Sequence, residues 1–422
     1  MNFRELHRNL KLRIGVGFFQ RFFDIMLVPL MVIHFSRLYG AATAGLMTLV
    51  VAVATVACNL VGGHLSDVYG RRRVLMAGEI GVCLSYVGLA LVNSPLVHSG
   101  PLTYGLYLTA TCSAGIALPA NEAMIVDVST PESRTAVYTI NYWVINVAFM
   151  LGSLVGGFFY DGYFFQLLTA AAVATGGIFL VTFLALSETA PAEAAQNPRG
   201  VKSALLGYLS VARDRVFLRL IVAALLVWCV EVQISSYIAV RLGSDFPEQQ
   251  LLSIGSWGVT VDGVNVLGIL RAINTLLVVV CGLWVGKVLG RLRDRLRLVA
   301  GVVIFTAGYM AWAVSDNAWL LIVAAFVVTL GELMNQPVNQ ALVADLVPAD
   351  ARTKYMAAYG LHVRLGYLVG SLSVILGSVV DSWVMALLYA GFGAAAIQLY
   401  RFLFRVQDAR AATAEPKAEA VA

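Results

Sequence analysis

The sequence is poor in charge. Of its 422 residues only 13% are Asp, Glu, Lys or Arg, whereas 59% are hydrophobic. Soluble domains carry about 25% charged residues, because charge keeps their surface in water. A chain with so little charge would expose large apolar patches and aggregate in water. The composition therefore excludes an ordinary soluble protein and favours one that lies in a lipid bilayer.

Cysteine and catalytic motifs are also lacking. The five cysteines all fall inside apolar runs, their number is odd, and no metal-ligand spacing appears. We interpret them as small apolar residues rather than disulfide partners or metal ligands. There is no Walker A motif, no Gly-x-Ser-x-Gly and no His-Glu-x-x-His. The sequence thus predicts no ATP-driven chemistry, no enzyme activity, no cofactor and no metal site.

Long apolar runs are what the chain has instead. About twelve runs of roughly 20 residues follow one another, each long enough to cross a bilayer as a helix. Most of the 29 basic residues fall in segments that share one side if both termini are cytoplasmic. This distribution accounts for the net charge of +5 without a nucleic-acid partner. It predicts a multi-pass plasma-membrane protein, with no removable signal peptide.

One polar segment divides the chain. Residues 188–214 are rich in Ala, Pro and charge, so we predict a cytoplasmic linker there. The linker would join an N-terminal bundle, 1–187, to a C-terminal bundle, 215–406. The Ala- and Glu-rich residues 407–422 are expected to form a flexible cytoplasmic tail.

A short motif occurs once in each half. Each copy has a Pro-x-Asn sequence near the inner end of a run, followed by an acid and an arginine. The repetition predicts two homologous bundles of about six helices. An arginine close to each acid would pair with it in one conformation and release it in another. The two copies are Pro119, Asn121, Asp127 and Arg134, and Pro337, Asn339, Asp345 and Arg352.

The segment from Gly63 to Arg73 lies between the second and third runs and contains Asp67, Gly70 and Arg71. It resembles the first inner-loop signature of the major facilitator superfamily. That resemblance implies an all-α membrane protein with 12 transmembrane helices in two pseudo-symmetric six-helix bundles. The predicted inner-side gating residues are Asp67, Arg71, Asp127, Arg134, Asp345 and Arg352.

Four further segments, 8–15, 121–127, 141–143 and 329–332, are similar to LmrP-type proton-coupled multidrug exporters. This similarity implies drug efflux and proton antiport. Exporters of this type carry an acid where Asn141 stands and another where Ser235 stands, so the proton stoichiometry is left open. Gly152 to Gly157 resembles the antiporter signature of drug-exporting facilitators, with Ser153 in place of the usual proline.

Polar residues inside apolar runs are the candidates for function, because an intramembrane charge usually faces a cavity or a partner. Glu332 is followed closely by several amides, and a carboxyl in a low-dielectric site exchanges its proton near physiological pH. Glu231 lies four residues before Ser235, on the same helical face. Arg21 and Asp24 are three residues apart and would pair. We predict proton coupling by Glu332, Glu231 and Asp24.

The remaining intramembrane polar residues are predicted to line a central substrate cavity. The partners would be a small-molecule solute, protons and lipid, and a monomer is expected. The function predicted is secondary export of amphipathic drugs by alternating access. The alternative is a transporter for a specific peptide-like or anionic metabolite, with Arg21 as the anion anchor. The predicted cavity residues are Gln20, Arg21, Asn141, Tyr142, Asn146, Gln233, Asn335, Gln336 and Arg364.

Overall fold

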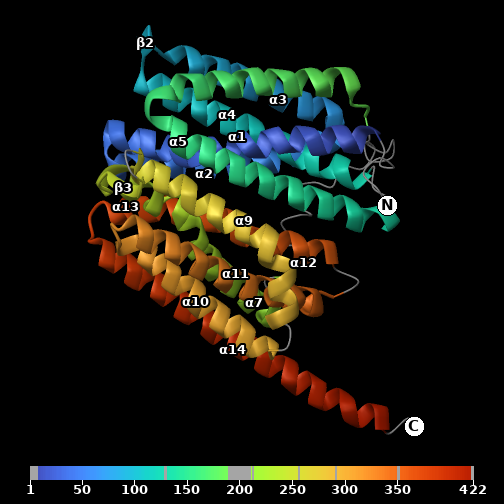
Figure 1. Ribbon diagram of the computed structural model, residues 1–422. Coiled ribbons are helices and arrows are strands. Elements are labelled where there is room, and N and C mark those ends of the chain that lie inside the picture. Colours follow the sequence, from blue (N-terminus) through green and yellow to red (C-terminus); the bar gives the residue numbers. More distant parts are fainter. Residues whose placement is uncertain are drawn as a thin grey trace. The chain divides into compact units, whose positions relative to one another are not determined.

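The computed structural model describes residues 8–127, 131–188, 211, 213–254, 257–289, 292–348 and 352–419. Helix dominates this part of the chain (Figure 1), because lipid offers no partner for backbone N–H and C=O groups and a helix pairs them internally. Nine of the described helices are long and apolar enough to cross a membrane. One of the nine spans, within α5 (Pro131–Ala185), is bent at Asp161–Tyr163 and so supplies two crossings, and α13 (Leu361–Gly377) is a shorter apolar helix. The predicted all-α membrane fold is confirmed.

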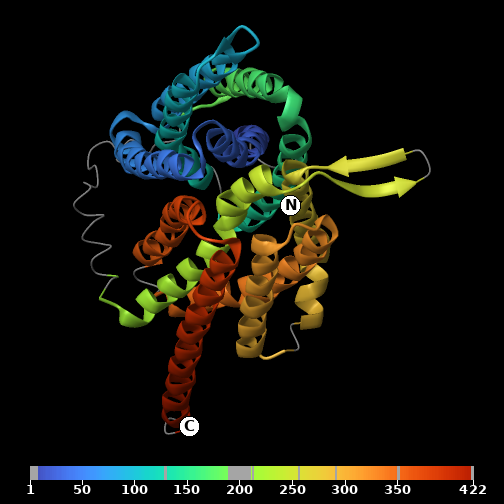
Figure 2. The same ribbon diagram turned by 90° about the vertical axis from the view of Figure 1, so that its left-hand side faces the viewer.

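The chain forms two compact units. Unit 1 comprises Met1–Ala204, Ser235–Leu276 and Ser371–Ser378. Viewed along its helices, α1 lies among α2 to α5 (Figure 2). Its elements are α1 (Arg8–Tyr39), α2 (Ala41–Tyr69), α3 (Arg71–Val92), β1 (Asn93–Ser94), β2 (Val97–His98), α4 (Gly100–Asp127), α5 (Pro131–Ala185), α8 (Tyr237–Asp245), β3 (Gln249–Ile254), β4 (Trp257–Val261), the start of α9 (Gly263–Leu289) and the end of α13 (Leu361–Gly377).

Helices of unit 1 approach one another closely at glycines. A Cβ added to Gly62 of α2 would lie 2.6 Å from the Cα of Ile116 in α4. The bend in α5 also depends on glycine: Gly162 has a φ of 98°, which other residues adopt only with strain. This bend folds α5 back on itself, so one helix supplies two adjacent crossings.

Unit 2 comprises Leu205–Ile234, Leu277–Gly370 and Val379–Ala422. Its helix α14 packs against α7 and α10, and α10 packs against α11. Large side chains such as Trp312, Tyr389 and Phe305 fill its core. The elements are α7 (Arg215–Glu231), the 3-10 helix η3 (Val232–Ser235), the end of α9, α10 (Asp294–Val314), α11 (Ala318–Leu346), α12 (Arg352–Tyr359), the start of α13 and α14 (Ser382–Glu419).

Several local features differ from the sequence-based expectation. The predicted seventh span is broken by η3 between α7 and α8, and the eleventh is broken at Gly360. The expected loop after α8 contains an antiparallel ribbon of β3 and β4, which Figure 2 shows in yellow. Helix α14 continues to Glu419, through most of the predicted flexible tail, because Ala, Arg and Glu favour helix there.

The two compact units do not follow chain order. Parts of α9 and α13 and all of α8 come from the second half of the sequence but belong to unit 1. The bundle boundaries predicted at 187 and 215 stay a prediction. Residues 189–210 of the predicted linker lie outside the described part of the chain.

The contact between α10 and α11 yields a first test. A Cβ on Gly331 would lie 2.7 Å from the carbonyl oxygen of Gly301 and 2.7 Å from the Cα of Phe305. Both neighbours are backbone, so Gly331→Ala must push the helices apart. We expect a loss of about 1–3 kcal/mol, as for other overpacked cores.

Thermal unfolding in detergent measures the effect. Gly391→Ala, on α14, is the matched control, since an added Cβ there meets nothing within 4 Å. Equal melting temperatures for the two variants would show that α10 and α11 do not need this close approach.

Candidate functional site

Two membrane acids lie together in unit 2. Glu231 is the last residue of α7 and Glu332 lies in the middle of α11, a helix in contact with α7. The two carboxyl groups interact electrostatically. Oε2 of Glu231 is buried and has no hydrogen-bond partner among the described residues. Glu231 and Glu332, which are 101 residues apart in the sequence, thus interact within one site.

The end of α7 fixes the position of Glu231. The chain changes there from α-helix to the tighter η3, which leaves carbonyl groups without their usual helical partners. The hydroxyl of Tyr309 donates a hydrogen bond of 3.1 Å to the carbonyl oxygen of Glu231. Helix α10 therefore anchors the backbone that carries this acid.

Two predicted cavity residues in unit 2 are buried and hydrogen-bonded. Gln233 has no exposed surface: its Nε2 donates to the carbonyl of Cys229 at 2.8 Å, and Tyr389 donates to its Oε1 at 3.4 Å. Asn335 is 3% exposed and donates to the carbonyl of Gly331 at 3.0 Å. Amides that satisfy their hydrogen bonds inside the protein can be buried at low cost. The assignment of both residues to a substrate cavity stays a prediction.

The other predicted cavity residues keep some exposure where the structure describes them. In unit 2, Gln336 and Arg364 are half-buried. In unit 1, Gln20, Arg21 and Asn146 are half-buried, and Asp24, a predicted proton-coupling residue, is exposed. Arg21 interacts electrostatically with Asp24, as their spacing on α1 predicts. The side chains of Asn141 and Tyr142 lie outside the described part.

The signature loop of unit 1 is built around Gly70. This residue separates α2 from α3 and has a φ of 90°. The backbone N–H groups of Arg71 and Arg72 donate to the two carboxylate oxygens of Glu188 at 3.1 and 3.0 Å. Glu188, which follows the end of α5, therefore caps the N-terminus of α3. A negative charge is stabilising there because the N-terminal end of a helix dipole is positive. Sequence reasoning missed this role, because Glu188 was assigned to the linker.

The structure describes only part of the predicted gating network. Asp345 is exposed and accepts a hydrogen bond of 3.2 Å from Gln407 rather than from an arginine. Arg71 is half-buried beside Glu188. The side chains of four predicted gating residues lie outside the described part: Asp67, Asp127, Arg134 and Arg352.

A buried polar cluster in unit 1 was also missed. Arg13 is 6% exposed and donates to the carbonyl oxygen of Asn121 at 3.1 Å and to its side-chain oxygen. Glu79 is 5% exposed, is hydrogen-bonded to Thr182 and interacts electrostatically with Arg13. Glu79 stands alone in an apolar run, a signal that was available in the sequence.

The second copy of the Pro-x-Asn motif makes different contacts. In unit 2, Nδ2 of Asn339 donates to the hydroxyl of Tyr359 at 2.7 Å. The hydroxyl of Tyr400 donates to Oδ1 of Asn339 at 2.9 Å. Asn339 thus joins α11 to α12 through its amide nitrogen and to α14 through its amide oxygen. The motif supplies a hydrogen-bonded amide in both units, half-buried at Asn121 and buried at Asn339, but each unit gives it a different partner.

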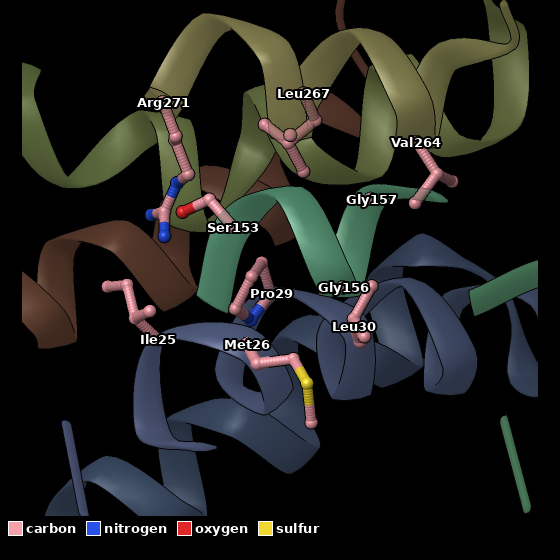
Figure 3. Close-up of a pocket in the computed structure, with 11 residues that line it drawn as sticks. Ile25, Met26, Pro29, Leu30, Ser153, Gly156, Gly157, Val264, Leu267 and Arg271 are labelled. Carbon is pink, nitrogen blue, oxygen red and sulfur yellow. The ribbon is translucent and has the colours of Figure 1, made fainter. Parts of the chain in front are cut away.

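Helices α1, α5 and α9 meet tightly in unit 1 (Figure 3). A Cβ on Gly268 of α9 would lie 3.0 Å from the Cα of Gly157 in α5, and Nδ2 of Asn265 donates to the carbonyl of Gly157 at 2.8 Å. The pocket at this contact has a volume of about 10 Å³, which holds one water at most. Arg271 lies beside Ser153 at its edge and donates to Ser235. We call this contact the α5–α9 seal.

Arg37, in the last turn of α1, adds a polar clamp to unit 1. It forms an ion pair of 2.5 Å with Asp161 at the bend of α5. It also donates to the carbonyl of Gly243 in α8 at 3.2 Å and lies 5.1 Å from the ring centre of Tyr160. One side chain therefore joins α1 to α5 and α8.

The fold and the relatives of this chain together define a multi-pass membrane transporter, not an enzyme. The family model for the Major Facilitator Superfamily matches residues 14–261 and 252–421. The chain belongs to the Major Facilitator Superfamily.

Characterised relatives include three named transporters. A Na⁺, Li⁺, K⁺/H⁺ antiporter of Planococcus maritimus is 27% identical. The match covers 97% of this chain and 99% of the antiporter. The class C tetracycline resistance protein of Escherichia coli is 24% identical, with 79% of each chain covered. The multidrug resistance protein MdtH of Aeromonas salmonicida is 23% identical over 85% of this chain and 83% of its own.

Solved structures of similar fold are peptide transporters and their relatives. A POT family transporter in complex with 5-aminolevulinic acid has a TM-score of 0.74 at 14% identity, with 96% of each chain covered. A peptide transporter POT in complex with sulfate has a TM-score of 0.70 at 17% identity, covering 97% of this chain and 96% of its own. At these identities the likeness concerns the fold alone.

The cap at the signature loop can be tested with two glycines. Gly70 and Gly40 both have positive φ, 90° and 82°, with ψ of 151° and 157°, a region almost restricted to glycine, so alanine causes similar backbone strain of about 1–3 kcal/mol at each. Only at Gly70 would the new Cβ meet Glu188, 2.8 Å from its Oε2. We expect Gly70→Ala to lower the melting temperature more than Gly40→Ala.

The same pair is then compared in a Glu188→Ala background. Removing the carboxylate should make the two glycine substitutions equally costly, because only the shared strain remains. A difference that persists without Glu188 would contradict the role assigned to this residue.

The α5–α9 seal is tested through access to Ser153, which is 6% exposed. Gly268→Ala places a Cβ 2.6 Å from the carbonyl of Ser153, so α5 and α9 must separate. The background for this test is a cysteine-free chain carrying Ser153→Cys. In this background we expect Gly268→Ala to raise the rate of maleimide labelling at position 153 at least about tenfold. This increase corresponds to a shift of about 1.4 kcal/mol toward the state in which α5 and α9 are separated. Gly177→Ala, where a Cβ meets nothing within 4 Å, is the control. Unchanged labelling would exclude a sealing role.

Proposed function

We propose that this transporter is a proton-driven antiporter that exports cationic solutes by alternating access. The observation that carries the proposal is the electrostatic interaction between Glu231 and Glu332 inside unit 2. Two carboxylates in a low-dielectric site repel each other strongly, and binding of a proton or a cation relieves this repulsion.

Exchange follows from this repulsion. When protons occupy the two acids, the site carries no excess negative charge and holds a cationic solute weakly. When the protons leave, the same carboxylates attract the cation. A proton and a cationic solute therefore compete for the same two carboxylates. Competition of this kind couples their movement in opposite directions.

The repulsion also gives protonation a conformational effect. Glu231 terminates α7, and its backbone is held by Tyr309 of α10, whereas Glu332 belongs to α11. Removing the charge on either acid relieves a force between α7 and α11. In the proposed cycle this change favours one arrangement of the helices over the other. Asp24, beside Arg21, is the proposed proton-coupling residue of unit 1.

Two classes of cation are candidates for the cargo. Amphipathic organic cations agree with the drug-resistance proteins among the relatives. Monovalent metal ions agree with the Planococcus maritimus relative, whose name states Na⁺, Li⁺, K⁺/H⁺ antiport and which aligns over nearly the full length of both chains. We place the organic cations first and treat the alkali ions as the second candidate.

The proposal is tested in proteoliposomes with an imposed pH gradient and a pH-sensitive dye inside. Addition of ethidium, Na⁺, Li⁺ or K⁺ reports which cation moves protons. We expect Glu332→Gln and Glu231→Gln each to reduce coupled flux at least about tenfold, equivalent to 1.4 kcal/mol, because an amide cannot exchange a proton.

Asp408→Asn, which removes an exposed acid in the C-terminal half of α14, is the matched control. Cation flux that is independent of the gradient in the unmodified protein, or that survives both glutamate substitutions, would refute proton coupling at this pair.

A further inference from the structure

Two cysteine thiols meet in unit 1. Cys58 of α2 and Cys112 of α4 are hydrogen-bonded to each other through their side chains. Both are free thiols and both are half-buried. They are far apart in sequence and neither belongs to the acid pair, the signature loop or the α5–α9 seal. The helix packing has thus created a dithiol that the sequence pattern does not reveal.

Backbone contacts hold the two thiols in place. A Cβ on Gly115, one turn after Cys112, would lie 3.4 Å from the Cβ of Cys58 and 3.0 Å from the carbonyl of Thr55. The side chain of Asn59, the residue after Cys58, donates to the carbonyl of Gly115 at 3.4 Å. With Gly62 set against Ile116 one turn further on, α2 and α4 have little freedom to separate here.

The ligand set restricts what this dithiol can bind. No group of three or more His, Cys, Asp or Glu side chains suited to a metal ion occurs in the described part of the chain, so a closed four-ligand zinc site is excluded here. Two sulfur atoms alone suit soft, thiophilic centres. A half-buried position within the membrane further favours an uncharged ligand over a hydrated ion.

We propose that Cys58 and Cys112 form a chelating site for uncharged trivalent organoarsenicals. An arsenoxide R–As=O reacts with the two thiols to form two As–S bonds, and the oxygen leaves as water with both thiol protons. Arsenic stays trivalent and no oxidant is required. The product ties α2 covalently to α4.

Chelation gives a quantitative signature. Once one sulfur has bound arsenic, the second thiol is already adjacent and reacts at a high effective concentration. We expect the intact pair to hold phenylarsine oxide at least about 100-fold more tightly than a chain with one of these cysteines replaced. Because the bound arsenic cross-links two helices, it should also raise the melting temperature.

The test uses the full-length protein in detergent, treated with phenylarsine oxide, then denatured and probed with maleimide. The unmodified chain should lose both thiols of this pair and gain one phenylarsenic group by intact mass. Cys58→Ser and Cys112→Ser should each abolish tight binding and the thermal shift. Cys83→Ser, which removes a half-buried cysteine of α3, should leave both unchanged. Dimercaptopropanol should reverse the binding, whereas a monothiol at equal concentration should not.

Peptide mapping of the unmodified chain makes the result independent of whether variants fold. A phenylarsenic bridge between the peptides of Cys58 and Cys112 supports the proposal. Equal affinity in the unmodified and single-cysteine chains, or arsenic found on Cys83, Cys229 or Cys281 instead, would overturn it.

Discussion

The constraint on which the structure depends is that lipid solvates neither backbone polar groups nor charge. Helices pair the backbone N–H and C=O groups, so each polar side chain needs a partner of its own. Arg13 is hydrogen-bonded to Asn121, Gln233 is hydrogen-bonded to Tyr389, and Arg37 forms an ion pair with Asp161. The interaction of Glu231 with Glu332 differs, because two carboxyl groups repel each other when both are ionised. The proposed coupling to protons follows from this repulsion.

Close backbone approach decides which side chains can meet. Lipid supplies no hydrophobic force between helices, so small residues that let backbones touch stabilise their association. Gly62 sets α2 against α4, Gly157 sets α5 against α9, and Gly331 sets α11 against α10. The dithiol, the α5–α9 seal and the anchoring of Glu231 by α10 all lie at or beside such contacts.

The Pro-x-Asn repeat shows how one motif serves two environments. Asn121 accepts a hydrogen bond from Arg13 in unit 1, whereas Asn339 bonds to Tyr359 and Tyr400 in unit 2. Asn121 joins α4 to α1, and Asn339 joins α11 to α12 and α14, where an apolar side chain would leave polar groups unpaired. The amide thus has a similar position in α4 and α11 but different partners in the two units.

The sequence by itself determined the membrane class, the helical crossings and the superfamily, because apolar length and the Gly63 to Arg73 signature are local properties of the chain. It also identified Glu231 and Glu332 as unusual, since a charge in an apolar run is visible without a fold. Only the tertiary structure decided that these acids interact, that Glu188 caps α3, that Gln233 and Asn335 are buried and hydrogen-bonded, and that Cys58 meets Cys112. Each of these depends on contact between segments far apart in the chain, and hydropathy carries no information on which helices are neighbours.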